Sequence, residues 1–70
     1  MQTQNIPLYI DTVTAAKVLG LSRSLLEKFR FHKDPDGPPY VIFGRSAVRY
    51  HVPSLLKWAE ARTVNAATQG

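Results

Sequence analysis

The sequence contains no cysteine and no long apolar run, and these two absences exclude several classes of protein. Without cysteine there is neither a disulfide framework nor a thiolate metal site. No stretch approaches the ~20 apolar residues of a membrane-spanning helix. The first ten residues also lack the basic start and apolar centre of a secretory signal. We therefore expect a cytoplasmic bacterial protein that makes no contact with a membrane.

Acidic residues are also scarce, since five stand against nine basic ones and the chain carries a net charge of +4. The pI of about 9.9 is typical of a protein that binds nucleic acid. Six of the nine cations fall within residues 23–49: Arg23, Lys28, Arg30, Lys33, Arg45 and Arg49. Three acidic residues interrupt this span, so we expect one copy of the chain to bind nucleic acid with modest affinity.

A first helix is predicted over residues 12–19. Asp11 stands at its N-cap position, and Gly20 follows it where a helix commonly ends with a positive φ. The spacing of apolar residues predicts a core-facing stripe of Val13, Ala16 and Leu19. The small pair Ala15 and Ala16 would allow a second helix to approach closely.

A second helix begins after Ser22, which is placed to cap it. Leu26 and Phe29 are its predicted core residues, and hydrogen-bonding side chains occupy the opposite side. Two helices joined by so short a turn form a helix-turn-helix, which places the second helix in the major groove of DNA. The residues expected to contact DNA are Ser22, Arg23, Ser24, Glu27 and Lys28. The alternative interpretation is an ordinary solvated helix face.

A β-hairpin is predicted after the prolines and glycine of residues 34–39, which end the second helix. Residues 40–43 and 48–52 are rich in β-branched and aromatic side chains, and residues 44–47 form the turn between them. Arg45 lies at the tip and Arg49 on the return strand. These cations suit a wing that touches the DNA backbone beside the helix. Alternatively, they only keep an edge strand soluble.

A third helix is predicted from Pro53, at a first helical position, and from Leu55 and Trp58, which would pack on the core. A lone tryptophan on such a stripe is typical of packing and not of base stacking. The predicted fold class is mostly α with a small β-hairpin, a winged helix-turn-helix of three helices and a two-stranded wing. It would occupy residues 10–62, after an N-terminal arm (1–9) and before a flexible C-terminal tail (63–70).

Residues that serve catalysis or metal binding form no constellation in the sequence. His32 and His51 lack the spacing of metal ligands. Ser22 and Ser24 have no evident histidine and carboxylate that would activate a nucleophile. We therefore expect no enzymatic activity, no cofactor, no metal and no small-molecule ligand.

Four sequence blocks together resemble a known family. They are Ala15-Ala16-x-x-Leu19-Gly20-Leu21-Ser22-Arg23-Ser24, Asp36-Gly37-Pro38-Pro39-Tyr40-Val41, Gly44-Arg45-x-x-Val48-Arg49-Tyr50 and Leu55-x-x-Trp58. In this order they are similar to the AlpA-like and excisionase-type winged helix-turn-helix family, which is related to the DNA-binding domain of MerR regulators. The resemblance covers about residues 8–62. It implies helix contacts to DNA from Arg23, Ser24, Glu27 and Lys28, and wing contacts from Arg45, Ser46 and Arg49.

The resemblance also implies a sequence-specific protein that binds double-stranded DNA of a mobile element in the nucleoid. We favour an excisionase, or recombination directionality factor, whose copies bind cooperatively near an attachment site and bend the DNA for a site-specific integrase. An AlpA-like transcriptional regulator is the alternative. A protein-interaction adaptor that has kept the winged fold is a second alternative, and RNA binding is a weaker one because single-strand readers display aromatic residues on an open sheet.

Overall fold

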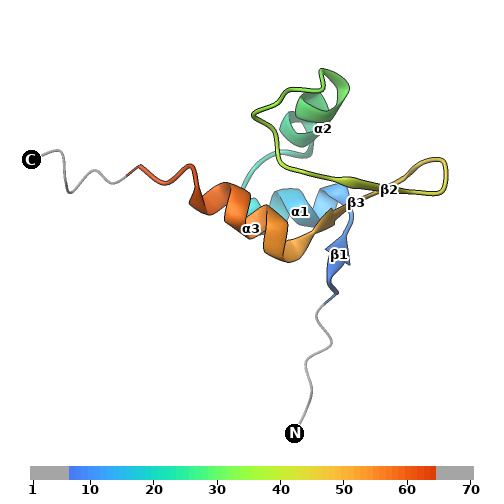
Figure 1. Ribbon diagram of the computed structural model, residues 1–70, viewed down its shortest axis with the longest axis horizontal. Helices are drawn as coiled ribbons and strands as arrows, with labels where there is room; N and C mark the ends of the chain where they lie inside the picture. The colour runs from blue at the N-terminus through green and yellow to red at the C-terminus, as the bar shows by residue number, and fades with distance from the viewer. Residues whose placement is uncertain (1–6, 65–70) are drawn as a thin grey trace, which may run out of the picture.

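The computed structural model describes residues 7–64, which form a mixed α/β fold. In chain order the elements are β1 (Tyr9–Ile10), α1 (Thr12–Leu19), α2 (Arg23–Phe31), β2 (Val41–Phe43), β3 (Ala47–His51) and α3 (Val52–Glu60). The strands form one antiparallel sheet in the order β1-β3-β2. Figure 1 shows α2 at one end of the molecule, above α1 and α3, while the β2–β3 hairpin projects sideways.

The bounds of α1 are those predicted from its two ends. Asp11 Oδ1 accepts the backbone N–H of Thr14 at 2.9 Å, so the helix begins at Thr12. Gly20 adopts a φ of 72°, and the N–H of Leu21 donates to the Ala16 carbonyl at 2.9 Å. This is a Schellman-type end, in which a left-handed residue satisfies carbonyls of the last turn. Only residues 20–22 separate α1 from α2.

The start of α2 is also as predicted, because Ser22 Oγ accepts the backbone N–H of Leu25 at 3.1 Å. The helix ends at Phe31, and Lys33 follows with a φ of 50°. The Asp34 N–H then donates to the Phe29 carbonyl at 3.0 Å, which turns the chain away from the helix axis. The predicted hairpin is confirmed, with Val41 opposite Arg49 and a turn in which Gly44 has a φ of 66°.

The prediction of a two-stranded wing was wrong in its strand count, because β1 adds a third strand. Tyr9 pairs with His51 and Ile10 pairs with Tyr50 on the far side of β3 from β2. Tyr9 therefore belongs to the sheet and not to an N-terminal arm. A strand of two residues is too short to show an alternating apolar pattern in the sequence. Only its pairing with β3 defines β1 as a strand.

The hydrophobic core lies where the two helices α1 and α2 meet the sheet and α3. Its buried residues are Ile10, Ala15, Ala16, Leu26, Tyr50 and Leu55. The predicted stripe on α1 was partly wrong, since Val13 is 40% exposed while Ala15 is 0% exposed. Close contact between α1 and its neighbours selects the side with the two smallest side chains, Ala15 and Ala16, which is the pair predicted to allow a second helix to approach closely.

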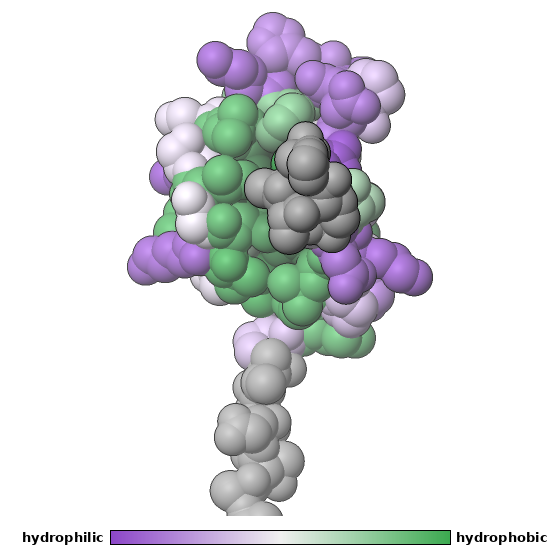
Figure 2. Space-filling model, turned by 90° about the vertical axis from the view of Figure 1, so that its left-hand side faces the viewer, coloured by the Kyte–Doolittle hydropathy of each residue, from purple (hydrophilic) through white to green (hydrophobic). Residues whose placement is uncertain are grey.

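The surface changes character along the molecule. In Figure 2 hydrophilic side chains cover the upper end, which α2 and the loop after it occupy, and hydrophobic side chains cover much of the middle. Within residues 7–64 no helix has both the length and the apolar character to cross a membrane. On the face shown in Figure 2, the end that carries α2 is the more hydrophilic one.

Candidate nucleic-acid interface

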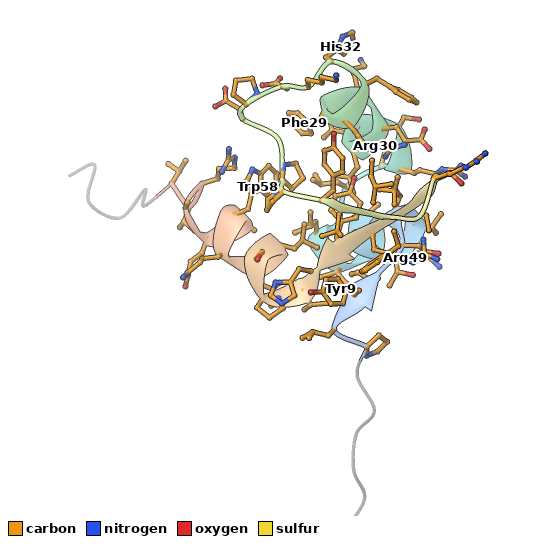
Figure 3. All side chains as sticks on the ribbon, turned by 45° about the vertical axis from the view of Figure 1, so that its right-hand side comes forward. Tyr9, Phe29, Arg30, His32, Arg49 and Trp58 are labelled. Atoms are coloured by element: carbon orange, nitrogen blue, oxygen red, sulfur yellow. The ribbon has the colours of Figure 1, made fainter. Side chains whose placement is uncertain are left out.

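A groove about 280 Å³ in volume lies between α2 and the hairpin, and the start of α1 forms its third wall. We call it the α2–β3 groove. Its lining residues are Asp11, Thr12, Val13, Arg23, Glu27, Arg30, Ser46, Val48 and Arg49. Figure 3 shows Arg30 on α2 and Arg49 on β3, on the two sides of this region. Four predicted DNA contacts thus meet in one place: Arg23, Glu27, Ser46 and Arg49.

On the helix side of the groove, Arg23 and Glu27 form an ion pair. Arg23 Nε donates to Glu27 Oε2 at 2.8 Å, and the Arg23 side chain is 64% exposed. An exposed pair at this spacing is worth only about 0.3–0.5 kcal/mol. Its loss would cost little if a phosphate took the place of the carboxylate.

On the hairpin side, Arg49 is held by the backbone. Its Nη1 donates to the Val48 carbonyl at 2.8 Å, and the residue is half-buried. The hydrogen bond fixes the guanidinium beside the groove, where it also acts on Asp11. The pKa of Asp11 lies below its usual range. The main cause is the hydrogen bond from the Thr14 N–H to its carboxylate, followed by the hydrogen bond from the Thr14 hydroxyl. The positive charge of Arg49 lowers this pKa further, while desolvation raises it.

This shift predicts a pH-dependent contribution of Asp11 to stability. A carboxyl group whose pKa is lower in the folded than in the unfolded state stabilises the fold at pH values above the unfolded pKa of about 3.9. This stabilisation is lost as the pH falls through the folded pKa. We expect Asp11→Asn to lower Tm at pH 6 and to have a smaller effect near pH 2. Thermal unfolding of both proteins at the two pH values measures this. An equal difference in Tm at both would contradict it.

Arg30 belongs to the groove, although sequence reasoning did not place it among the DNA contacts. Within residues 7–64 its Nη1 atom is buried and has no hydrogen-bond partner. A signal for it was present, since Arg23, Glu27 and Arg30 stand at i, i+4 and i+7 and so share one face of α2.

The other predicted contacts lie elsewhere. Lys28 follows Arg23 by five residues, about 140° around the helix, and it lines a separate hollow of about 120 Å³ with Phe29 and His32. Ser24 and Arg45 are exposed. Ser22 is engaged as the α2 cap. Among the α2 residues predicted to contact DNA, the structure therefore brings Arg23 and Glu27 to the groove beside the hairpin and leaves Lys28 outside it.

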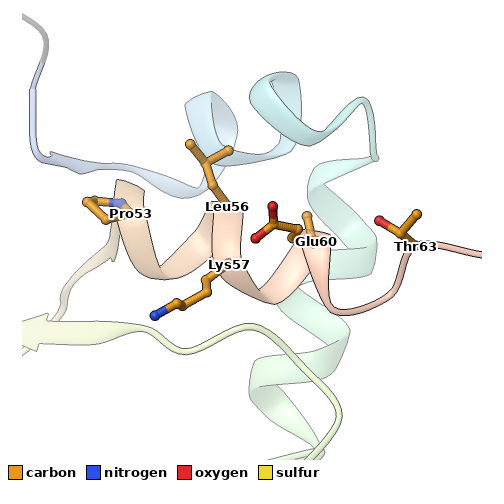
Figure 4. Close-up of a pocket in the computed structure, with 6 residues that line it drawn as sticks. Pro53, Leu56, Lys57, Glu60 and Thr63 are labelled. Carbon is orange, nitrogen blue, oxygen red and sulfur yellow. The ribbon is translucent and has the colours of Figure 1, made fainter.

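A hollow of about 510 Å³, larger than the α2–β3 groove, lies on α3 and not at the arginines. Pro53, Leu56, Lys57 and Glu60 line it with Ala59 and Thr63, and Figure 4 shows that all of them come from α3 and the residues just after it. Since one helix supplies the whole lining, no polar groups converge from different elements. We therefore place the candidate site at the α2–β3 groove.

The two histidines are separate from this groove. His51 Nδ1 lies 2.8 Å from Ser54 Oγ, and His32 is exposed. Residues 7–64 contain no group of three or more side chains able to hold a metal ion. The groove offers guanidinium and hydroxyl groups, whose chemistry suits an anion. Neither a comparison with protein-family models nor a search of curated proteins finds a match for this chain.

Proposed function

We propose that the chain is a sequence-specific protein that binds double-stranded DNA through a winged helix-turn-helix, with α2 in the major groove and the β2–β3 hairpin as the wing. The observation that carries this proposal is the convergence of Arg23, Arg30 and Arg49 from two elements on one groove. Guanidinium groups suit phosphate oxygens, which supply most of the affinity of proteins for DNA.

The two sides of α2 suit two kinds of contact. The side with Arg23 and Arg30 faces the hairpin and would follow the DNA backbone. Ser24 and Lys28 are exposed on α2 outside this groove, where hydrogen-bonding side chains can reach base edges. This division supports a protein that recognises sequence and does not only neutralise charge.

Within this class we propose an excisionase of the AlpA-like and excisionase-type family. A single domain of this size buries only ~600–1,000 Å² on DNA. Several neighbouring copies would raise occupancy through contacts with one another, and a bound array could bend an attachment site for an integrase. An AlpA-like transcriptional regulator is the alternative, because the same contacts would serve at a promoter.

A mobility-shift titration at two salt concentrations tests the proposal. The duplexes cover the nearest integrase attachment site and the promoter of the encoding gene, with Arg23→Ala as the variant. Stepwise, cooperative, salt-sensitive shifts at the attachment site alone would support an excisionase, and a shift at the promoter alone would support the regulator. If no duplex shifts, the protein-interaction adaptor is favoured, and the hollow on α3 beside the half-exposed Leu56 is its candidate surface.

The salt dependence of binding gives a quantitative prediction. If three or four cations neutralise phosphates, log K falls with log salt at a slope near −3, from about 0.9 per phosphate. We expect Arg49→Gln to weaken binding to all sequences equally and to reduce the slope by about one. Lys28→Ala serves as the contrast, since loss of a base contact relaxes specificity by ~1–3 kcal/mol. A slope unaffected by Arg49→Gln would remove Arg49 from the backbone contacts.

A further inference from the structure

Arg30 is half-buried, and one nitrogen of its guanidinium group has an unusual environment. Its Nη1 atom is buried and, within the described chain, donates to no acceptor. A guanidinium stays charged at any ordinary pH, and a buried donor that lacks an acceptor costs free energy. The Arg30 guanidinium carbon lies 5.1 Å from the centre of the Phe31 ring, a contact that helps to hold the side chain in place. Such a donor points to an acceptor that residues 7–64 do not supply.

The charges around Arg30 indicate whether the missing acceptor is an anion or a neutral group. Three arginines and two carboxylates line the α2–β3 groove, so the cations are in excess. Both carboxylates are already engaged, because Asp11 accepts the Thr14 N–H and Glu27 accepts from Arg23. Arg30 and Arg49 therefore have no carboxylate paired with them in the described chain. The groove is suited to an anion and not to a cation.

The shape of the groove and its other donors indicate the class of anion. Its volume of about 280 Å³ accommodates a small oxyanion with part of an attached ester. The planar forks of two guanidinium groups match the oxygens of a phosphate. The hydroxyl groups of Thr12 and Ser46 line the same groove and can donate to further oxygens.

We infer that the α2–β3 groove is a binding site for one phosphate oxyanion, which Arg30 and Arg49 hold between α2 and the hairpin. The inference rests on the proposed function where it takes this phosphate to be a phosphodiester of duplex DNA. A bound phosphate would connect the two elements and fix the angle between them. Arg30 is thereby assigned a ligand contact, and its substitution is not expected to destabilise the free protein.

Titration of the full chain with inorganic phosphate, against sodium chloride at matched ionic strength, tests the site itself. We expect saturable shifts of the Arg30 Nε–H and Ser46 amide resonances in NMR spectra. Arg30→Gln should weaken phosphate binding by about tenfold or more while Tm stays the same or rises. Lys17→Gln, which removes an exposed charge on α1 outside the groove, should bind phosphate as the natural chain does. Absence of saturable shifts, or equal loss in both variants, would overturn the inference.

A second experiment identifies the source of the phosphate. A duplex that shifts with the natural chain is prepared with one neutral methylphosphonate linkage at each backbone position in turn. At one position the substitution should weaken binding about tenfold for the natural chain and have no effect for Arg30→Gln. Equal effects on both proteins at every position would overturn the assignment to DNA. If no duplex binds but inorganic phosphate does, the proposed function fails and the anion site stands with free phosphate esters as its ligands.

Discussion

Replacing Leu26 with alanine is expected to leave most of the chain unfolded at 25 °C. Leu26 is 0% exposed and is the only fully buried side chain that α2 contributes to the core of the described chain. Leucine-to-alanine substitutions in cores cost about 2–5 kcal/mol, and a domain of this size rarely has more than 3–5 kcal/mol of stability. The cost is therefore comparable with the whole free energy of unfolding.

Urea unfolding followed by circular dichroism measures this effect. Leu56→Ala is the matched control, because it removes the same atoms from a side chain that is 49% exposed on α3. Its effect should be much smaller, since surface substitutions usually change stability by less than about 0.5 kcal/mol. A cooperative transition of Leu26→Ala at the natural midpoint would show that α2 is not anchored through this residue.

The second large effect is expected at Trp58, which connects the loop after α2 to α3. Its Nε1 donates to the Asp36 carbonyl at 2.9 Å, and Nη2 of Arg62 donates to the same oxygen. The Arg62 guanidinium lies 4.2 Å from the centre of the indole ring, and the Phe29 ring packs edge-on at 6.1 Å. We call these contacts the Asp36 clamp; Figure 3 shows Phe29 and Trp58 within it.

Trp58→Ala removes every contact of this clamp that involves the ring. Full truncation of a buried tryptophan costs about 3–5 kcal/mol; Trp58 is half-buried, so we expect a loss near the lower end. Because the clamp holds the end of α2, DNA specificity should fall as well as stability. Trp58→Phe keeps an aromatic ring but loses the hydrogen bond and part of the packing, so its cost should be smaller than that of Trp58→Ala and should include the about 0.5–1.5 kcal/mol of the hydrogen bond.

Urea unfolding and the ratio of specific to non-specific DNA affinity distinguish the two roles of the clamp. A folded Trp58→Phe protein with lower specificity and an unchanged salt slope would show that the clamp orients α2. Unchanged specificity in that variant would limit Trp58 to a contribution to stability.

The features that sequence reasoning predicted correctly are those that a few neighbouring residues determine. The caps at Asp11 and Ser22 and the left-handed Gly20 act within one helical turn, so their signals are complete in the local sequence. The strand β1 and the Asp36 clamp depend on partners far along the chain, since Tyr9 pairs with His51 and Asp36 accepts from Trp58. No local pattern encodes these pairings.

The candidate groove was predictable in part for the same reason. Arg23 and Glu27 lie on one helical face, which the sequence displays, and Arg30 continues that face. Which face turns toward the hairpin depends on how α2 packs, and sequence reasoning therefore grouped Lys28 with Arg23. That Arg49 lies in the same groove as the α2 residues likewise depends on how the hairpin packs in the fold.

The chain passes from β3 to α3 without a linker, since His51 ends the strand and Val52 begins the helix. The Val52 N–H donates to the Leu8 carbonyl at 2.8 Å, and the neighbouring Tyr50 is buried, so the junction has little freedom to bend. We therefore expect the hairpin and α3 to move together as one rigid unit. If the proposed DNA contact tilts the hairpin, α3 should turn with it, and a change in the fluorescence of Trp58 would measure this coupling.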